Sequence, residues 1–223
     1  MARMPRVVVP GYPHHVTQRG NRRQKTFFCN EDYRYYRELL SEAAVDCGAA
    51  VWAYCLMPNH VHLVVVPRDE DGLRSLLGEA HRRYTRHINF REGWRGHLWQ
   101  ERFHSFVMDE QYLLATVRYV ERNPVTARLC REAVDWPWSS ARAHLAGKDD
   151  GLVSVKPMLE LIDDWAAYLS KESASGEVVE HIKRHSRTGR PLGDPQFVTE
   201  LESLTGRVLA PRRPGRKPGA SSG

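Results

Sequence analysis

The sequence of 223 residues has no long hydrophobic run. No stretch approaches the roughly 20 consecutive apolar residues that a membrane-spanning helix needs. The N-terminal run from Arg3 to Pro10 is too short, and too interrupted by proline, for a signal peptide. Because 41% of the residues are hydrophobic, the chain can still bury a globular core. We therefore expect a cytoplasmic protein without a membrane partner.

Cysteine is also scarce. The four cysteines, Cys29, Cys47, Cys55 and Cys130, are scattered along the chain and form no Cys-x-x-Cys pair. This spacing indicates neither a zinc site nor a disulfide framework. We expect all four thiols to be reduced and mostly structural.

Acidic residues are missing from the first thirty residues, a region that contains a basic loop with Arg19, Arg22, Arg23 and Lys25. At the other end, the segment from Lys183 to Gly219 carries nine Lys or Arg residues against three acidic residues, which accounts for the whole net charge of +6. Clusters of this kind favour a polyanionic partner, although simple solvation of the charges is the alternative.

Residues 210–223 consist mainly of Pro, Gly, Arg and Ser, a composition that predicts a disordered tail. Because it is also basic, we interpret this tail as a tether for a nucleic acid such as DNA, outside the folded core. If its four cations all contact single-strand phosphates, deleting it should reduce the slope of log affinity against log salt by roughly 3. These cations are Arg212, Arg213, Arg216 and Lys217.

The stretch from Met57 to Pro67 reads Met-Pro-Asn-His-Val-His-Leu-Val-Val-Val-Pro. Its second half is rich in β-branched residues, which predicts a strand that ends at Pro67. Because side chains alternate across a strand, His60 and His62 share one face, about 7 Å apart at the backbone. Two imidazoles so placed suit one divalent metal ion. A His-x-His pair on a strand is also often structural, so the motif alone leaves both interpretations open.

A helix is predicted from Asp109 to Arg122, because apolar residues recur there with helical spacing. Asp109 is a suitable N-cap, and Pro124 favours a helix end near Asn123. Tyr119 and Asn123 are four residues apart, so their side chains share a helix face and can reach the same point in space. A phenol and an amide oxygen in this arrangement suit a nucleophile and a third metal ligand acting on a phosphate.

Four motifs follow one another along the chain: Pro58 to His62, Trp99 to Phe103, Arg118 to Val125 and Trp136 to Ser140. In this order and spacing they resemble the motifs of the REP-associated tyrosine transposases, bacterial relatives of the single-tyrosine, His-hydrophobic-His (HUH) transposases. The resemblance covers about residues 14–145 and continues more weakly into residues 188–216. It implies a bacterial enzyme that cuts single-stranded or hairpin DNA and associates with the nucleoid when bound.

The resemblance also implies a ferredoxin-like α+β catalytic domain over residues 1–146. The residue pattern agrees, because strands predicted over 12–19, 50–56, 60–66 and 98–108 are interleaved with helices over 32–47 and 72–89. This order predicts a four-stranded antiparallel sheet with helices on one face. The helix that starts at Asp109 would then roof the other face, toward which His60 and His62 point.

Residues 147–223 are expected to form a C-terminal helical extension that ends in the basic tail. Helices are predicted over 155–169 and 197–204, and residues 173–176 resemble a linker. On the helix over 72–89, the outward residues Arg82, Arg83 and Arg86 suit phosphate contacts or simple solvation equally well. His14 and His15 point to opposite faces of the first strand, and we interpret both as structural or DNA-contacting.

The resemblance implies that Tyr119 attacks a DNA phosphorus, giving a 5′-phosphotyrosine and a free 3′-hydroxyl. His60, His62 and Asn123 would hold Mg²⁺ or Mn²⁺. Because some relatives carry Gln, His or Glu at the third position, the short neutral Asn123 predicts modest metal affinity. Tyr112 lies seven residues before Tyr119 on the same helix face and is a rival nucleophile; only the motif context favours Tyr119.

Two other functions compete with this interpretation. One is a DNA-binding protein that has lost its chemistry, and the other is a metal-dependent hydrolase in which Tyr119 is only structural. The presence of every candidate catalytic residue argues against the first. The DNA target and the oligomeric state do not follow from the sequence.

Overall fold

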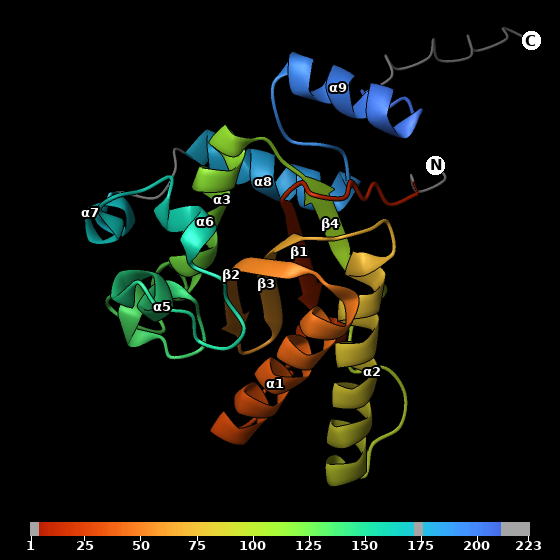
Figure 1. Ribbon diagram of the computed structural model, residues 1–223. Helices are drawn as coiled ribbons and strands as arrows, with labels where there is room; N and C mark the ends of the chain where they lie inside the picture. The colour runs from red at the N-terminus through yellow and green to blue at the C-terminus, as the bar shows by residue number, and fades with distance from the viewer. Residues whose placement is uncertain (1–4, 172–175, 211–223) are drawn as a thin grey trace, which may run out of the picture.

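The computed structural model describes residues 5–171 and 176–210 and has an α+β fold (Figure 1). One antiparallel sheet contains four strands in the order β2-β3-β1-β4. The strands are β1 (His14–Arg19), β2 (Ala50–Met57), β3 (His60–Val66) and β4 (His104–Val107). Helix α1 (Asn30–Cys47) connects β1 to β2, and α2 (Gly72–Glu92) connects β3 to β4. The predicted ferredoxin-like arrangement is therefore confirmed.

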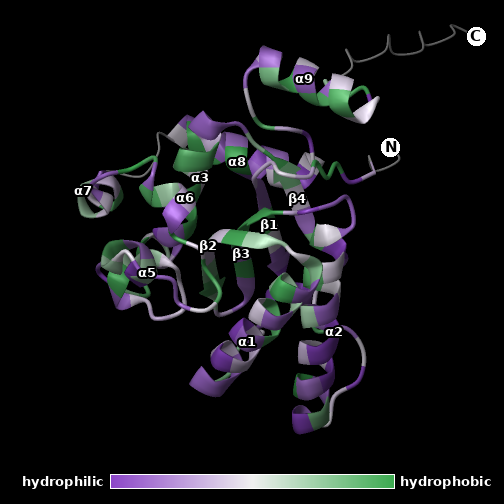
Figure 2. Cartoon of the chain, viewed as in Figure 1, coloured by the Kyte–Doolittle hydropathy of each residue, from purple (hydrophilic) through white to green (hydrophobic). Residues whose placement is uncertain are grey.

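The two faces of the sheet build two separate parts of the core. Val61, Leu63 and Val65 point toward α1 and α2 and belong to one buried apolar cluster. Val64 belongs to a second cluster on the other face, with residues of α3 (Glu110–Glu121). In Figure 2 the strands are mostly hydrophobic, whereas the outer ends of α1 and α2 are largely hydrophilic. The alternation in β3 therefore directs His60 and His62 toward the α3 face, as predicted.

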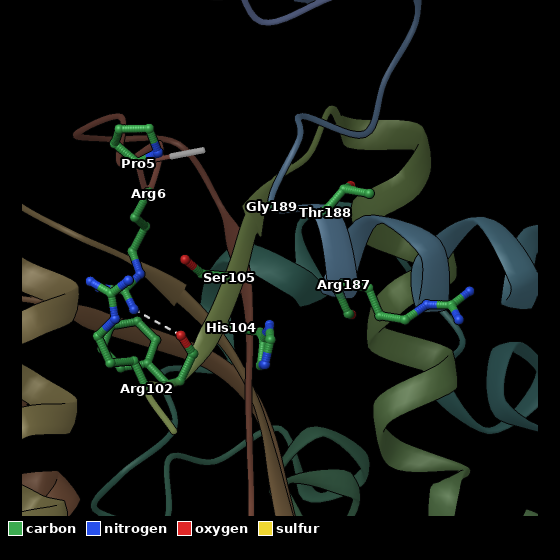
Figure 3. Close-up of a pocket in the computed structure, with 10 residues that line it drawn as sticks. Pro5, Arg6, Arg102, His104, Ser105, Arg187, Thr188 and Gly189 are labelled. Atoms are coloured by element: carbon green, nitrogen blue, oxygen red, sulfur yellow. Dashed lines mark hydrogen bonds between the residues drawn. The ribbon is translucent and has the colours of Figure 1, made fainter. Parts of the chain in front are cut away.

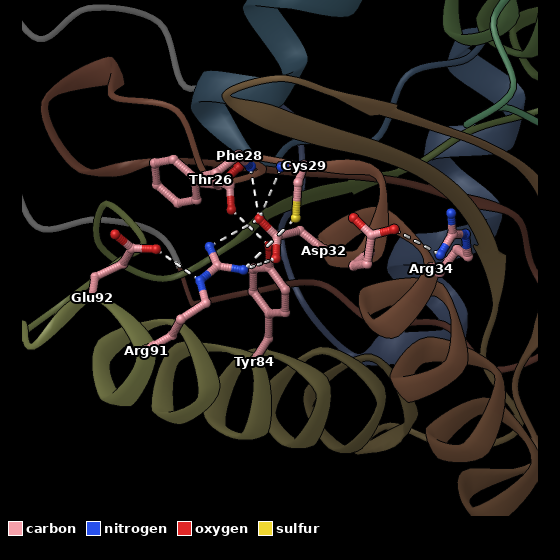
Figure 4. Close-up of polar contacts among 9 residues, drawn as sticks. Thr26, Phe28, Cys29, Asp32, Arg34, Tyr84, Arg91 and Glu92 are labelled. Atoms are coloured by element: carbon pink, nitrogen blue, oxygen red, sulfur yellow. Dashed lines mark hydrogen bonds and ion pairs between the residues drawn. The ribbon is translucent and has the colours of Figure 1, made fainter.

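A buried carboxylate holds the beginning of α1 against the end of α2 (Figure 4). Asp32 is fully buried, accepts hydrogen bonds from the backbone N–H groups of Phe28 and Cys29, and pairs with Arg91. At the other end of α1, Gly48 takes a left-handed conformation with φ 64°, which ends the helix as the sequence predicts. These contacts fix the basic loop before α1 next to the 58–59 turn, where Thr26 N–H donates to the Pro58 carbonyl.

Asp109 caps α3, since its side chain accepts a hydrogen bond from Tyr112 N–H. The described residues also form several further elements. These are η1 (Asn21–Arg23), α4 (Asn123–Thr126), η2 (Ala133–Asp135), α5 (Ala141–Ala146), α6 (Lys156–Leu159), α7 (Trp165–Ser170), α8 (Gly176–Thr188) and α9 (Pro195–Thr205). Figure 1 shows α3 and α8 on the side of the sheet opposite α1 and α2.

Two predicted elements differ clearly from the structure. The fourth strand begins at His104 instead of residue 98, because Glu101 has a positive φ of 54° and interrupts the extended run before it. The helix predicted over 155–169 is broken into α6 and α7, because Asp164 caps a new helix by accepting from Ala167 N–H. The linker-like Ser173 to Ser175 and the basic tail lie outside the described residues.

Among the described residues, no helix combines the length and the apolar character needed to cross a membrane.

Candidate functional site

A chain of hydrogen bonds holds His60 and determines which of its two ring nitrogens carries the proton. The Asn59 amide Nδ2 donates to the Arg23 carbonyl at 3.1 Å, which turns Asn59 Oδ1 toward His60 Nδ1 at 2.7 Å. An amide oxygen only accepts, so His60 Nδ1 carries the proton and Nε2 keeps its lone pair. The basic loop therefore orients one of the two predicted metal ligands through the side chain that precedes it.

His62 is oriented in the same way by a neighbour on β1. Its Nδ1 lies 3.0 Å from His15 Nε2, and the two rings are stacked with their centroids 5.2 Å apart. On its other side, His62 Nε2 lies 3.4 Å from Asn123 Nδ2, an N–H donor. One tautomer satisfies both contacts, with the proton on Nδ1 of His62 and the lone pair on Nε2. His15 Nδ1 then donates to Ser186 Oγ, 3.4 Å away on α8.

Tyr119 lies directly beside this histidine pair. Its ring is nearly perpendicular to that of His62, at 85° and 5.5 Å between centroids, and its side chain hydrogen-bonds with Asn123. The predicted juxtaposition of Tyr119 and Asn123 is therefore present. The rival Tyr112 points elsewhere, since its hydroxyl lies 3.2 Å from His181 Nδ1 on α8.

The electrostatics of the site keep its groups neutral at pH 7. Burial, together with Arg19, lowers the pKa of His60 to about 4, and burial lowers the pKa of His62 well below its ordinary range. Burial raises the pKa of the Tyr119 hydroxyl, opposed by the Asn123 hydrogen bond and by the charges of Lys183 and Arg19. The site therefore contains two neutral imidazoles that can act as metal ligands, and a neutral phenol.

The residues fit a divalent metal ion. No group of three or more His, Cys, Asp or Glu side chains suited to a metal occurs in the described ranges, so a carboxylate-rich site is absent there. His60 and His62, however, have ring centroids 4.9 Å apart, and because both Nδ1 atoms carry the proton, both Nε2 atoms keep a lone pair that can bind a metal ion. At His62 this lone pair faces Asn123 Nδ2, which would have to turn away for a metal ion to bind. Partners that fix ligating histidines in this way are typical of metal sites. Asn123 can contribute a third, neutral donor.

A buried carboxylate anchors the helix that carries Tyr119. Glu121 is fully buried and accepts hydrogen bonds from Ser140 Oγ at 2.5 Å, His144 Nδ1 at 2.6 Å and Trp165 Nε1 at 3.0 Å. Ser140 Oγ in turn accepts from the backbone N–H of Tyr54 on β2. The third and fourth sequence motifs therefore meet here, and their contact fixes α3 against the sheet.

The predicted DNA-binding residues are divided between the two faces. Arg19 lies opposite His60 in the β1–β3 register and acts electrostatically on the site. Arg22, Arg23 and Lys25 are exposed on the adjoining basic loop. On α2, across the sheet from the site, Arg82 pairs with Glu79 and Arg83 pairs with Glu42, while Arg86 is exposed. Arg212, Arg213, Arg216 and Lys217 lie outside the described residues.

Sequence reasoning missed three residues around the site. His15 was interpreted as structural or DNA-contacting, and pairing β1 with β3 would have placed it diagonally next to His62. Lys183 and Ser186 were missed because no helix was predicted over 176–188. Helix α8 packs beside β4 and α3, and its Ile182 is buried with them in one apolar cluster, so the extension completes this face.

Comparisons with known proteins agree with this architecture. The family model described as "Transposase IS200 like" matches residues 9–123, about half of the chain. A REP-associated tyrosine transposase of Escherichia coli (strain K12) is 21% identical over 159 residues, which cover 71% of this chain and 87% of that protein. The solved structure of a REP-associated tyrosine transposase bound to a REP hairpin superimposes with a TM-score of 0.57 at 22% identity, covering 70% of this chain and 90% of the other. The sequence resemblance is thus confirmed, and the chain belongs to the family of IS200-like transposases.

Proposed function

We propose that this transposase cleaves and rejoins single-stranded DNA beside a hairpin, through a covalent bond between Tyr119 and a 5′-phosphate. The observation that carries the proposal is the position of Tyr119 beside His62, with Asn123 in contact with both side chains. A weak nucleophile such as a phenol needs activation by a neighbouring base or metal ion, and the imidazole of His62 is placed to supply the base or to hold the metal.

Each residue has a defined part in this reaction. The Tyr119 oxygen attacks the phosphorus, the bond from phosphorus to the 3′-oxygen breaks, and that oxygen takes up a proton to become a free 3′-hydroxyl. Because the phenol is neutral at pH 7, it must lose its proton during attack, and Arg19 and Lys183 favour the developing negative charge. Asn123 holds the Tyr119 hydroxyl toward His62.

His60, His62 and Asn123 would hold one Mg²⁺ or Mn²⁺ ion, whose chemistry is to polarise the phosphate oxygens and neutralise their charge. Mn²⁺ accepts imidazole more readily than Mg²⁺ does. The neutral third donor, Asn123, supports a modest affinity for either ion.

Rejoining uses the same residues in reverse. The phosphotyrosine bond keeps the energy of the broken DNA linkage, so the 3′-hydroxyl of another strand can attack it and release Tyr119. The relative described as bound to a REP hairpin supports hairpin DNA as the substrate class.

The test is to incubate the full chain with Mn²⁺ and a hairpin oligonucleotide that has single-stranded flanks, labelled at its 3′ end in one sample and at its 5′ end in another. The proposal predicts that the 3′ label stays with the denatured protein while the 5′-labelled fragment is released. Cleavage without an adduct would indicate a hydrolase. Binding without cleavage would indicate a protein that has retained only its DNA affinity.

A further inference from the structure

Helix α8 of the C-terminal extension lies against the face of the sheet that carries the site. Its Ile182 is 1% exposed and packs in one apolar cluster with residues of β4 and α3. Figure 3 shows the C-terminal end of α8 beside β4, where Gly189 lies next to Ser105. The helix is therefore fixed against the sheet, and the polar residues around Ile182 have defined positions relative to the site.

Two contacts place Lys183 at the rim of the site. His181 Nδ1 lies 3.2 Å from the Tyr112 hydroxyl on α3, and Ser186 Oγ lies 3.4 Å from His15 Nδ1 on β1. Lys183 lies between these two contacts along α8. It is three residues before Ser186, so both side chains are on the helix face that meets the site.

The charge of Lys183 acts on the nucleophile. Within residues 5–171 and 176–210, the charges that act most strongly on the Tyr119 hydroxyl are those of Lys183, Arg19 and Cys55. A hydrogen bond to Glu180 at 2.8 Å raises the pKa of Lys183, so its amine is protonated at pH 7. Lys183 and Glu180 are both exposed, and such an ion pair is weak. Lys183 can therefore exchange Glu180 for a bound DNA strand.

The proposed reaction needs a proton donor that the residues assigned so far do not supply. An alkoxide is a poor leaving group at pH 7, so the 3′-oxygen must take up a proton as its bond to phosphorus breaks. The ring protons of His60 and His62 are on Nδ1, where neighbouring side chains accept them. A guanidinium such as that of Arg19 does not lose its proton in proteins. Cys55 is fully buried, out of reach of DNA, which leaves Lys183.

We propose that Lys183 is the general acid of strand cleavage and donates a proton to the 3′-oxygen as the bond between that oxygen and phosphorus breaks. The amine of Lys183 is then neutral and regains a proton from water, while the phenol proton of Tyr119 passes to water. In rejoining, the neutral amine takes the proton of the attacking 3′-hydroxyl. The inference rests on the proposed function, because it names the proton donor of the same reaction.

The test uses hairpin DNA in which sulfur replaces the 3′-oxygen at the cleaved linkage. A thiol has a pKa of about 8.5, so the sulfur leaves as a thiolate without taking up a proton. Adduct formation is measured in single turnover with the full chain, Mn²⁺ and saturating DNA. Under these conditions a change in DNA affinity does not alter the measured rate.

Lys183→Met should slow adduct formation on ordinary DNA about 100-fold, because it removes the general acid. On the sulfur-substituted DNA the same variant should react at nearly the wild-type rate, since this leaving group needs no proton. Equal slowing on both DNAs would show that Lys183 acts through its charge or position alone, and a wild-type rate on ordinary DNA would show that it has no role. Either result would overturn the proposal.

Lys183→Arg distinguishes proton donation from charge. Arginine keeps the positive charge but does not give up a proton, so this variant should be as slow as Lys183→Met on ordinary DNA and should also recover on the sulfur-substituted DNA. Cleavage of ordinary DNA by Lys183→Arg at the wild-type rate would mean that only the charge matters, and the proposal would be wrong.

Arg184→Met is the matched control, because Arg184 is the next residue on α8 and is exposed like Lys183. Neither change touches the buried Ile182, so both variants should unfold at the wild-type temperature. Arg184→Met should react with both DNAs at the wild-type rate. If it showed the same selective defect as Lys183→Met, the effect would not be specific to Lys183 and the proposal would be wrong.

The two DNAs also separate this inference from the proposed function. If the wild type forms no adduct with either DNA, the proposed function is wrong, and the inference is wrong with it. If the wild type forms an adduct with both DNAs and sulfur does not restore the rate of Lys183→Met, the assignment of Tyr119 stands and only the proton donor is wrong.

Discussion

His15 and His62 share a hydrogen bond across neighbouring strands, with His15 Nε2 3.0 Å from His62 Nδ1 and the rings stacked at an interplanar angle of 12°. This contact puts the proton of His62 on Nδ1, so that Nε2 keeps the lone pair that a metal ion would need. It also connects the site to the C-terminal extension, because the other nitrogen of His15 meets Ser186 on α8. His15 is therefore a positioning residue for the proposed metal site.

His15→Phe should weaken Mn²⁺ binding 10- to 100-fold, the usual effect of removing a partner of a ligating histidine. His15→Gln should retain most of the affinity, because its amide oxygen can accept the proton of His62 Nδ1. Isothermal titration calorimetry with Mn²⁺ in the absence of DNA measures both. Wild-type affinity in His15→Phe would show that the contact is only structural.

His60→Ala and His62→Ala should each abolish Mn²⁺ binding and DNA cleavage together, because either change leaves too few donors for the ion. EDTA should have the same effect on the wild type. The control is His87→Ala, which removes an exposed imidazole on α2, across the sheet from the site. Full cleavage in EDTA would show that the reaction needs no metal ion and that both histidines have only a structural role.

Glu121→Gln should slow cleavage more than it weakens Mn²⁺ binding, because it loosens the helix that carries Tyr119 and leads to Asn123 but leaves His60 and His62 on β3. The loss of a buried carboxylate that accepts three hydrogen bonds should lower the free energy of unfolding by about 3 kcal/mol. Urea denaturation and metal titration measure the two effects. Glu160→Gln, at an exposed position on the chain, is the matched control; an equal loss of stability there would refute the anchoring role.

His14 should make the fold sensitive to acid. Its Nε2 accepts from Val9 N–H at 3.1 Å, and burial lowers its pKa from 6.5 to about 4. Between pH 4 and pH 6.5, His14 is therefore protonated in the unfolded chain but not in the folded chain. The free energy of unfolding consequently decreases as the pH falls from 6.5 toward 4.

His14→Gln should reduce this loss by about 1.4 kcal/mol per pH unit, since one proton fewer is taken up on unfolding. Urea denaturation at several pH values between 4 and 6.5 measures the slope for both proteins. Other buried histidines contribute equally to the pH dependence of both proteins, so the difference between the two slopes is due to His14. Parallel curves for the two proteins would contradict the prediction.

Local patterns were sufficient to predict most of the catalytic fold. The alternation in His60 to Val66 and the helical spacing after Asp109 each depend on neighbouring residues, and both elements are present. The same patterns could not reveal His15 as a partner of His62, because the order of strands in a sheet depends on contacts far apart in the sequence. The bend at Glu101, a positive-φ conformation at an ordinary residue, also has no local sequence signal.

The extension was harder to predict for a related reason. Helix α8 is mostly polar, and only its Ile182 is buried, so its sequence resembles a solvated segment. Its place is set by contacts made after the sheet has formed, such as Ser186 with His15 and His181 with Tyr112. For this reason the sequence alone did not identify Lys183 and Ser186 as neighbours of the site.

Identifying the residue that becomes joined to DNA tests whether Tyr119 is the nucleophile. The full chain is incubated with 3′-labelled hairpin DNA and Mn²⁺, and the adduct is digested and sequenced by mass spectrometry, in parallel with Tyr119→Phe and Tyr112→Phe. We predict that the phosphodeoxynucleotide is on Tyr119, that Tyr119→Phe forms no adduct yet binds DNA with nearly wild-type affinity, and that Tyr112→Phe still forms one. An adduct that persists in Tyr119→Phe and disappears in Tyr112→Phe would contradict the account.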